Sequence, residues 1–212
     1  MSTTVETNQL RTGAVILAAG ASTRMDKPKM LLPWGATSVI GHLIAQWRRL
    51  KVEQLAVVCG SVDLQLQTEL DRLDFPAANR ILNPAPERGM FSSIRCAARW
   101  TGWGAGLTHW AIALGDQPHL RPATLSGLLE FGAAHPEAIC QPSYLEHARH
   151  PVLIPKSPFK ELAESPHETL KDFLKIERFE VMCFEVDDPG LDLDIDQPAD
   201  YERALQLYLK SA

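Results

Sequence analysis

The stretch that decides the fold runs from Gly13 to Lys29 and reads GAVILAAGASTRMDKPK. Its first part, Gly13–Ala19, is wholly apolar, which is typical of a strand buried on both faces of a sheet. Small residues follow, together with three basic ones, Arg24, Lys27 and Lys29. Open backbone N–H groups beside concentrated positive charge favour an anion-binding loop, and the alternative is a solvated basic loop. The P-loop and dinucleotide-binding fingerprints are both absent.

The rest of the chain alternates between strand-like and helix-like segments. Further strands are expected at residues 54–59, 79–82, 109–114, 138–141, 152–154 and 179–186. Helices are expected at residues 37–50, 62–73, 92–100, 122–134, 158–163, 168–176 and 198–209. This alternation predicts an α/β fold on a largely parallel sheet, in which ligands bind beyond the carboxyl ends of the strands. The residues that follow each strand are therefore the candidates for chemistry.

Length and composition limit the class of protein. The chain has 212 residues, 45% of them hydrophobic, and a net charge of −5. We expect one domain over residues 12–212 after a flexible tail at residues 1–11. An acidic chain is a poor non-specific nucleic-acid binder, and no apolar run approaches the roughly 18 residues that span a bilayer. The N-terminus also lacks a secretory signal pattern, so the sequence predicts a cytoplasmic protein without a nucleic-acid or membrane partner.

A carboxylate directly follows the strand expected at residues 109–114. The sequence there is Leu114-Gly115-Asp116-Gln117-Pro118, so Asp116 is expected at the carboxyl edge of the sheet. Mg²⁺ in proteins is commonly held by one or two carboxylates together with substrate phosphates, which makes Asp116 a candidate ligand. The alternative is a simple turn, since Gly, Asp and Pro all suit turns.

Acidic and aliphatic residues alternate strictly from Leu191 to Asp196. In an extended chain this alternation places Asp192, Asp194 and Asp196 on one face. Such close negative charges repel each other unless solvent or a cation offsets them. The segment is either part of a metal site together with Asp116 or the exposed face of an edge strand.

A proline-rich loop runs from Asn83 to Gly89 and leads into an expected helix. Ser92 or Ser93 is a candidate cap for that helix. The backbone N–H groups of the same turn are also suited to contact a base or a phosphate.

Taken in this order, these segments resemble nucleotidyltransferases with a GT-A-like, Rossmann-type fold. The closest resemblance is to the molybdenum cofactor cytidylyltransferases of the MobA-like NTP transferase superfamily. The matching motifs are Leu17–Lys29, Asn83-Pro84 with Arg88–Ser93, Gly115–Pro118, His150–Val152 and Leu193–Asp200. The resemblance covers about residues 12 to 209 and implies a three-layer α/β/α sandwich with a mostly parallel mixed sheet.

The resemblance also implies roles for individual residues. The implied nucleotide-binding residues are Leu17, Ala18, Ala19, Gly20, Ser22, Arg24, Lys29, Asn83, Gly89 and Ser93. Arg24, Lys29 and Asp116 are the implied catalytic residues. The implied Mg²⁺ ligands are Asp116 and Asp196, with Asp194 as an alternative ligand. His150 and Pro151 are implied to face the acceptor.

The implied activity is transfer of a nucleoside monophosphate from an NTP to a phosphorylated acceptor, with release of pyrophosphate. The Ala18-Ala19-Gly20 opening and the Gly115–Pro118 motif look like the cytidylyl branch, which favours CTP as substrate and molybdopterin as acceptor. The resemblance further implies delivery of the product to a molybdoenzyme partner. The alternatives are a sugar-phosphate or isoprenoid acceptor, or a nucleotide-binding protein that has lost turnover.

The sequence departs from the family pattern at three places. Asp26 stands where the family has glycine, and Ala148-Arg149 replace the glycine that usually precedes His-Pro. The loop at residues 164–168 reads ESPHE instead of a Gly-Asp-x-Gly type. The last two changes fall where the family contacts its acceptor, so the residues support the nucleotide chemistry better than they identify the acceptor.

Overall fold

The computed structural model describes residues 10–20, 27–176 and 178–211. Strand β1, Thr12–Leu17, lies in the middle of the sheet, and all its residues are buried. It pairs in parallel with β4, Gln54–Gly60, and with β6, His109–Leu114. Successive residues of β1 point to opposite faces, so Ala14 and Ile16 pack on one side and Val15 and Leu17 on the other. The apolar run at Gly13–Ala19 therefore forms the doubly buried strand that the sequence predicts.

The whole sheet is mixed and mostly parallel. Its strand order is β10-β7-β9-β6-β1-β4-β5, and β8 pairs with β7. The remaining strands are β5 (Arg80–Asn83), β7 (Ile139–Tyr144), β8 (His147–Ala148), β9 (Val152–Pro155) and β10 (Val181–Glu185). Strand β9 runs antiparallel to β6 and β7, whereas β10 is parallel to β7. This topology confirms the predicted fold class.

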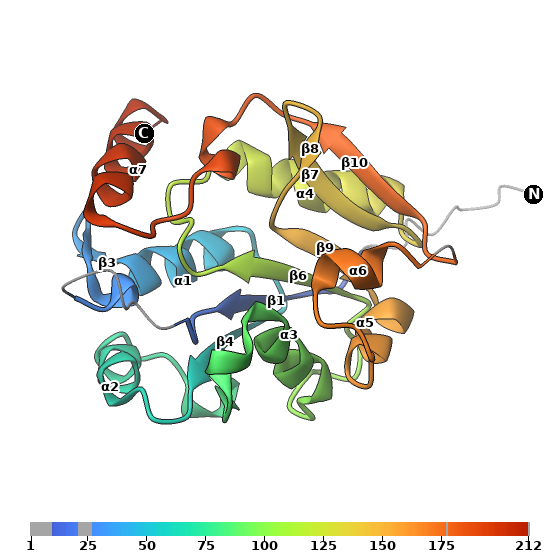
Figure 1. Ribbon diagram of the computed structural model, residues 1–212, viewed down its shortest axis with the longest axis horizontal. Helices are drawn as coiled ribbons and strands as arrows, with labels where there is room; N and C mark the ends of the chain where they lie inside the picture. Colours follow the sequence, from blue (N-terminus) through green and yellow to red (C-terminus); the bar gives the residue numbers. More distant parts are fainter. Residues whose placement is uncertain (1–9, 21–26, 177, 212) are drawn as a thin grey trace, which may run out of the picture.

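Helices cover both faces of this sheet, which gives the predicted three-layer arrangement (Figure 1). The first face is covered by α1 (Val39–Arg49), α2 (Leu64–Arg72), α4 (Pro122–Ala134) and α7 (Pro198–Ser211). The second face is covered by α3 (Met90–Arg99), α5 (Lys156–Leu162) and α6 (Leu170–Leu174). Four short 3-10 turns, η1 to η4, lie at Lys29–Leu31, Ala77–Asn79, Pro86–Arg88 and Pro189–Asp192.

Most element boundaries differ from the sequence-based expectation by only a few residues, for local reasons. Helix α1 begins at Val39 because the Ser38 side chain caps it by accepting a hydrogen bond from Gly41 N at 3.2 Å. The preceding residues form a small hairpin of β2, Pro33–Trp34, and β3, Thr37–Ser38, which the sequence analysis missed. Two-residue strands carry too little periodicity to be recognised from sequence.

The prediction of an extended chain over the alternating aspartates is only partly correct. Asp192 belongs to η4, while Leu193 is extended, so this stretch is not an edge strand. The burial alternates as expected, since Leu191, Leu193 and Ile195 are buried and the three aspartates are exposed. The aliphatic side chains anchor the segment to the core, and the carboxylates remain outside.

The first described residues are part of the fold. In the predicted tail, Leu10 packs against the core and Arg11 forms hydrogen bonds with Glu53 at 2.9 Å, so these two residues belong to the fold. Among the described residues, none of the helices combines the length and the apolar character that crossing a bilayer requires.

Gly115 provides a test of how tightly β1 and β6 are held at their ends. A Cβ atom added at Gly115 would lie 2.7 Å from the carbonyl oxygen of Leu17 and 2.9 Å from Sδ of Met30. We expect Gly115→Ala to lower the free energy of unfolding by about 1–3 kcal/mol, because the β1 backbone must shift. Urea denaturation measures this change.

Gly104→Ala is the matched control for that substitution. The nearest atom to a Cβ at Gly104 is 3.6 Å away, which is an ordinary van der Waals contact. Its free energy of unfolding should stay within about 0.5 kcal/mol of wild type. Equal losses for the two variants would show that the Gly115 contact is not tight.

Candidate active site

The candidate site lies where β1 and β6 end side by side. Their parallel register pairs Leu17 with Leu114, and the N–H of Gly115 donates to the carbonyl of Leu17 at 3.0 Å. The N–H of Ala18 donates to Val58 O of β4 at 2.9 Å. The chain leaving β1 and the turn that carries Asp116 are therefore fixed to each other by backbone hydrogen bonds, as expected at the carboxyl edge of a parallel sheet.

Lys29 links two of the predicted metal ligands. Its Nζ atom lies 2.6 Å from Oδ1 of Asp196 and 3.6 Å from Oδ2 of Asp116. Asp196 is held in place by Asp200 of α7, whose Oδ2 accepts hydrogen bonds from the N–H groups of Asp196 and Gln197 at 3.2 and 3.1 Å. Residues from three distant parts of the sequence thus meet at one ammonium group, and we call Lys29, Asp116 and Asp196 the Lys29 cluster.

Gln117 connects the third aspartate to the same place. The side chain of Gln117 is 4% exposed, and its Nε2 donates to Oδ1 of Asp194 at 2.9 Å. The N–H of Ile195 donates to the carbonyl of Asp116 at 3.2 Å. The segment before α7 is therefore tied to the Asp116 turn by a side-chain and a backbone hydrogen bond. The sequence analysis did not single out Gln117, although its position between Asp116 and a proline was the available signal.

The electrostatics of this edge favour an additional cation. Burial, and to a smaller extent the negative charges of Asp194 and Asp196, raise the pKa of Asp116 to about 6, while Lys29 opposes the shift. Within the described ranges, no three His, Cys, Asp or Glu side chains converge as a metal cage. One or two carboxylates together with substrate phosphates are nevertheless what Mg²⁺ or Mn²⁺ commonly uses, so Asp116 and Asp196 fit a divalent cation bound with substrate.

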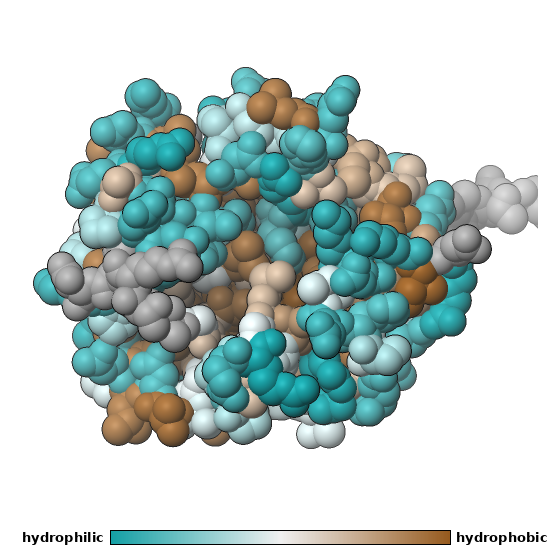
Figure 2. Space-filling model, viewed as in Figure 1, coloured by the Kyte–Doolittle hydropathy of each residue, from teal (hydrophilic) through white to brown (hydrophobic). Residues whose placement is uncertain are grey.

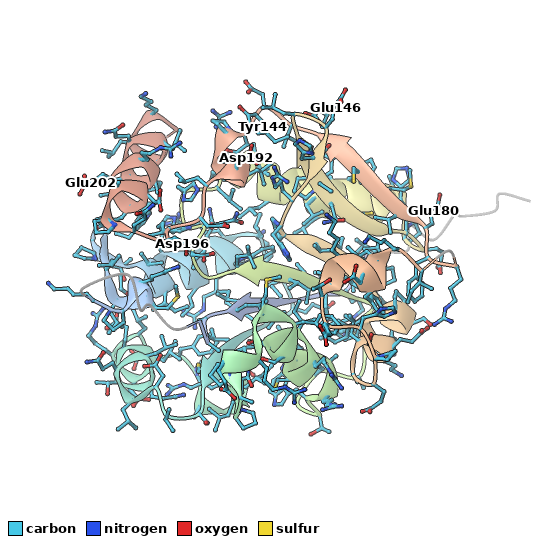
Figure 3. All side chains as sticks on the ribbon, in the orientation of Figure 1. Tyr144, Glu146, Glu180, Asp192, Asp196 and Glu202 are labelled. Carbon is cyan, nitrogen blue, oxygen red and sulfur yellow. The ribbon has the colours of Figure 1, made fainter. Side chains whose placement is uncertain are left out.

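Asp192 and His150 each have a partner outside the Lys29 cluster. Asp192 pairs with Arg149, which follows β8, and Figure 3 shows Asp192 closer to the β7–β8 hairpin and Asp196 closer to α7. His150 is half-buried, with Nδ1 3.4 Å from the carbonyl of Ile112. Burial lowers the pKa of His150, and the charge of Asp194 opposes that shift. His150 therefore lies where the Asp194 charge acts on it, and Pro151 after it is buried.

The chain after β1 is only partly described. Ala18 and Ala19 are buried and Gly20 is exposed. Ser22 and Arg24, which the sequence analysis assigns to nucleotide binding, lie outside the described residues, as does Asp26. Their predicted roles stay predictions, whereas Lys29 is shown beside Asp116 and Asp196.

Residues 14–181 match the family described as the MobA-like NTP transferase domain. The chain belongs to this family. The match covers most of the sheet, Lys29, Asp116 and the loop before α3, whereas Asp194 and Asp196 lie beyond its end. The nucleotidyltransferase fold and the resemblance to the MobA-like NTP transferase superfamily are therefore confirmed.

Individual relatives agree with this family. The bifunctional protein GlmU of Streptomyces griseus is 34% identical over 127 residues, which is 59% of this chain and 26% of GlmU, so the chain spans about a quarter of that relative. The crystal structure of Rv0371c from Mycobacterium tuberculosis is 27% identical, with a TM-score of 0.74 and coverage of 93% of this chain and 99% of Rv0371c. Rv0371c has also been solved in complex with manganese, at 26% identity, a TM-score of 0.67 and coverage of 92% and 98%.

Molybdopterin-guanine dinucleotide biosynthesis protein A from Archaeoglobus fulgidus shares the fold. Its TM-score is 0.68, its identity is 19%, and the alignment covers 93% of this chain and 99% of that protein.

In this NTP transferase domain, the loop before α3 is built around Asn83. Asn83 is 1% exposed, donates through Nδ2 to Oγ of Ser92 and Ser93 at 2.8 and 3.0 Å, and accepts from the N–H of Ala85 at 2.9 Å. The predicted serine cap is wrong, because α3 begins at Met90 with Gly89 as its N-cap. The φ of Gly89 is +86°, in the left-handed region that favours glycine.

The Asn83 amide thus has a structural role whatever else it contacts. We expect Asn83→Ala to lower the free energy of unfolding by about 1–3 kcal/mol, because it leaves buried polar groups without partners. Asn79→Ala is the control, since Asn79 is half-buried and accepts only one long hydrogen bond, of 3.4 Å, from Gln54. Thermal or urea unfolding compares the two variants, and an Asn83→Ala protein as stable as the control would contradict this role.

Proposed function

We propose that this chain transfers a nucleoside monophosphate from an NTP to a phosphorylated acceptor and releases pyrophosphate. The observation that carries the proposal is the Lys29 cluster at the carboxyl ends of β1 and β6, where Nζ of Lys29 lies between the carboxylates of Asp116 and Asp196. A cation between carboxylates at the binding edge of an α/β sheet suits a polyanionic substrate that brings its own metal ion. Membership of the MobA-like NTP transferase family supports the same reaction.

The proposed step needs no covalent intermediate with the protein. An oxygen of the acceptor phosphate attacks the α-phosphorus of the NTP, a new P–O bond forms, and the bond to the β-phosphate oxygen breaks with departure of pyrophosphate. The acceptor is already an anion, so it does not require a general base. The protein contributes by holding the two anions in line and by offsetting their charge.

Lys29 is suited to offsetting the negative charge of the two reacting anions. Its side chain is 15% exposed, so its charge acts in a partly desolvated setting where electrostatic interactions are stronger. When a triphosphate enters, Lys29 would exchange a carboxylate contact for phosphate oxygens. The backbone N–H groups after Leu17 would contact the nucleotide, and Arg24 would be a second cationic contact.

Asp116 and Asp196 would hold a divalent cation, with Asp194 as an alternative ligand. When bound, the ion would neutralise phosphate charge and orient the phosphate oxygens. The raised pKa of Asp116, caused by burial and by neighbouring carboxylates, is what such a cation would relieve. The manganese complex of the relative Rv0371c supports a divalent metal, and Mg²⁺ is our specific proposal.

CTP is the proposed nucleotide, and molybdopterin is the proposed acceptor. The support is the likeness of Ala18-Ala19-Gly20 and Gly115–Pro118 to the cytidylyl branch of the family. The half-buried His150 would face the acceptor, together with Pro151. Action in the cytoplasm and delivery of the product to a molybdoenzyme belong to the same proposal.

Two substitutions test the Lys29 cluster. Lys29→Ala should reduce the rate of pyrophosphate release about 10²–10³-fold, since it removes one preorganised cationic donor. Asp116→Ala should be at least as damaging, and excess EDTA should abolish activity in the wild-type chain. Lys210→Ala, which removes an exposed lysine at the end of α7, is the matched control and should keep wild-type activity. Near-normal turnover by Lys29→Ala would rule out this assignment.

A substrate panel tests the identity of the reactants. We expect pyrophosphate release with CTP, Mg²⁺ and molybdopterin to exceed that with GTP, ATP or UTP by at least about tenfold, which corresponds to a difference of about 1.4 kcal/mol in transition-state binding. Sugar phosphates and isoprenoid precursors serve as competing acceptors. Preference for one of those acceptors would replace molybdopterin, and nucleotide binding without turnover on any acceptor would identify a binding protein.

A further inference from the structure

The first turn of α7 touches both segments that supply the ion pair between Lys29 and Asp196. On one side, Oδ2 of Asp200 accepts a hydrogen bond from the N–H of Asp196 at 3.2 Å. On the other side, the hydroxyl of Tyr201 donates to the carbonyl of Pro33, which lies four residues after Lys29. Two adjacent residues of one helix therefore connect the backbones on the two sides of this ion pair.

The ion pair is too weak to fix the distance between these two segments. Nζ of Lys29 lies 2.6 Å from Oδ1 of Asp196, but the Asp196 side chain is 50% exposed. An ion pair with an exposed partner contributes little to stability, because solvent screens the charges and the side chains lose freedom. A lysine side chain is also long and flexible, so its ammonium group stays between two carboxylates only if its backbone is held in place. Another contact must therefore hold the Lys29 segment.

Packing of Met30 holds this segment on the side of Asp116. Met30 is 8% exposed, and a Cβ atom added at Gly115 would lie 2.9 Å from its Sδ. Gly115 directly precedes Asp116, so this packing sets the distance between Lys29 and the Asp116 turn. The position of the same segment relative to α7 requires a contact of its own.

Tyr201 provides the contact with α7. The outer side of α7 is mostly hydrophilic (Figure 2), and the ring of Tyr201 packs edge-on against Trp34, with the ring centroids 6.1 Å apart. Tyr208, two turns further along, also packs against Trp34, at 5.3 Å, so the two tyrosines share the ring packing. The hydroxyl of Tyr201 reaches the carbonyl of Pro33 in addition. Burial raises the pKa of Tyr201, so its hydroxyl keeps its proton at neutral pH and remains a donor.

We propose that Tyr201 is a positioning residue for Lys29, because its hydrogen bond to Pro33 keeps the Lys29 backbone at the distance from α7 at which the ammonium group reaches Asp196. The bond links α7 to the segment that carries Lys29 through a single hydroxyl group. The action of Lys29 on phosphates rests on the proposed function, whereas its positioning by Tyr201 does not.

Chemical labelling of Lys29 in the free chain tests the positioning directly. The full chain is treated briefly with an N-hydroxysuccinimide ester of acetic acid, and mass spectrometry compares the acetylation of Lys29 with that of the exposed Lys171 in α6. Tyr201→Phe should raise this ratio about 3–10-fold, as expected for the net effect of one hydrogen bond, because Lys29 then leaves the carboxylates more often. Tyr208→Phe is the matched control and should keep the wild-type ratio, since the bond to Pro33 stays.

Two outcomes of the labelling would overturn the proposal. One is an unchanged ratio in Tyr201→Phe, which would show that the hydroxyl does not hold Lys29 in place. The other is an equal rise in Tyr201→Phe and Tyr208→Phe, because the position of Lys29 would then depend on the general packing of α7 and not on the bond to Pro33.

Steady-state kinetics test what the positioning contributes to the reaction. Tyr201→Phe should lower kcat and kcat/KM for pyrophosphate release together by about 3–10-fold, because a displaced Lys29 stabilises the transition state less. In a chain that carries Lys29→Ala, the same substitution should have no further effect, since Tyr201 acts through Lys29. A loss that persists in this background would overturn that route. If the wild-type chain releases no pyrophosphate with any nucleotide and acceptor, the proposed function fails, and the labelling ratio still decides whether Tyr201 positions Lys29.

Discussion

The structure depends above all on one constraint, the burial of β1 on both faces between β4 and β6. Because Leu17 pairs in register with Leu114, both strands end at the same level, and the hydrogen bond from Gly115 N to Leu17 O fixes the turn that follows. Asp116 is thereby placed next to the end of β1, with its Oδ2 3.6 Å from Nζ of Lys29. A site composed of residues distant in sequence therefore follows from the pairing of two apolar strands.

The carboxylates near this edge are separated by their partners. Asp196 contacts Lys29, Asp194 accepts from Gln117, and Asp192 pairs with Arg149. Buried aliphatic residues between them fix the segment, so the charges do not spread apart to relieve their repulsion. The net charge of −5 is thus compatible with an anionic substrate, because part of the negative charge is arranged around a lysine and is suited to a divalent cation.

The sequence predicted those parts of the fold and site that depend on local pattern. The apolar run at Gly13–Ala19, the alternation of strands and helices, and the place of Asp116 after β6 all follow from hydrophobic periodicity and strand direction. It could not predict that Lys29 bridges Asp116 and Asp196, because that contact spans 167 residues and depends on where α7 packs. The hydrogen bond from Asn83 to Ser92 and the one from Gln117 to Asp194 were missed for the same reason. The partners of a buried amide can be identified only in the folded chain.

The two arginines on the outer part of α3 differ in their partners. Arg95 and Arg99 are four residues apart, so they lie on the same face of the helix. Glu164 neutralises Arg99, which is farther from the N-terminus of α3, and Arg95, which is nearer to it, has no carboxylate partner among the described residues. Positive charge is therefore greatest where the helix dipole is also positive and where α3 meets the carboxyl edge of the sheet.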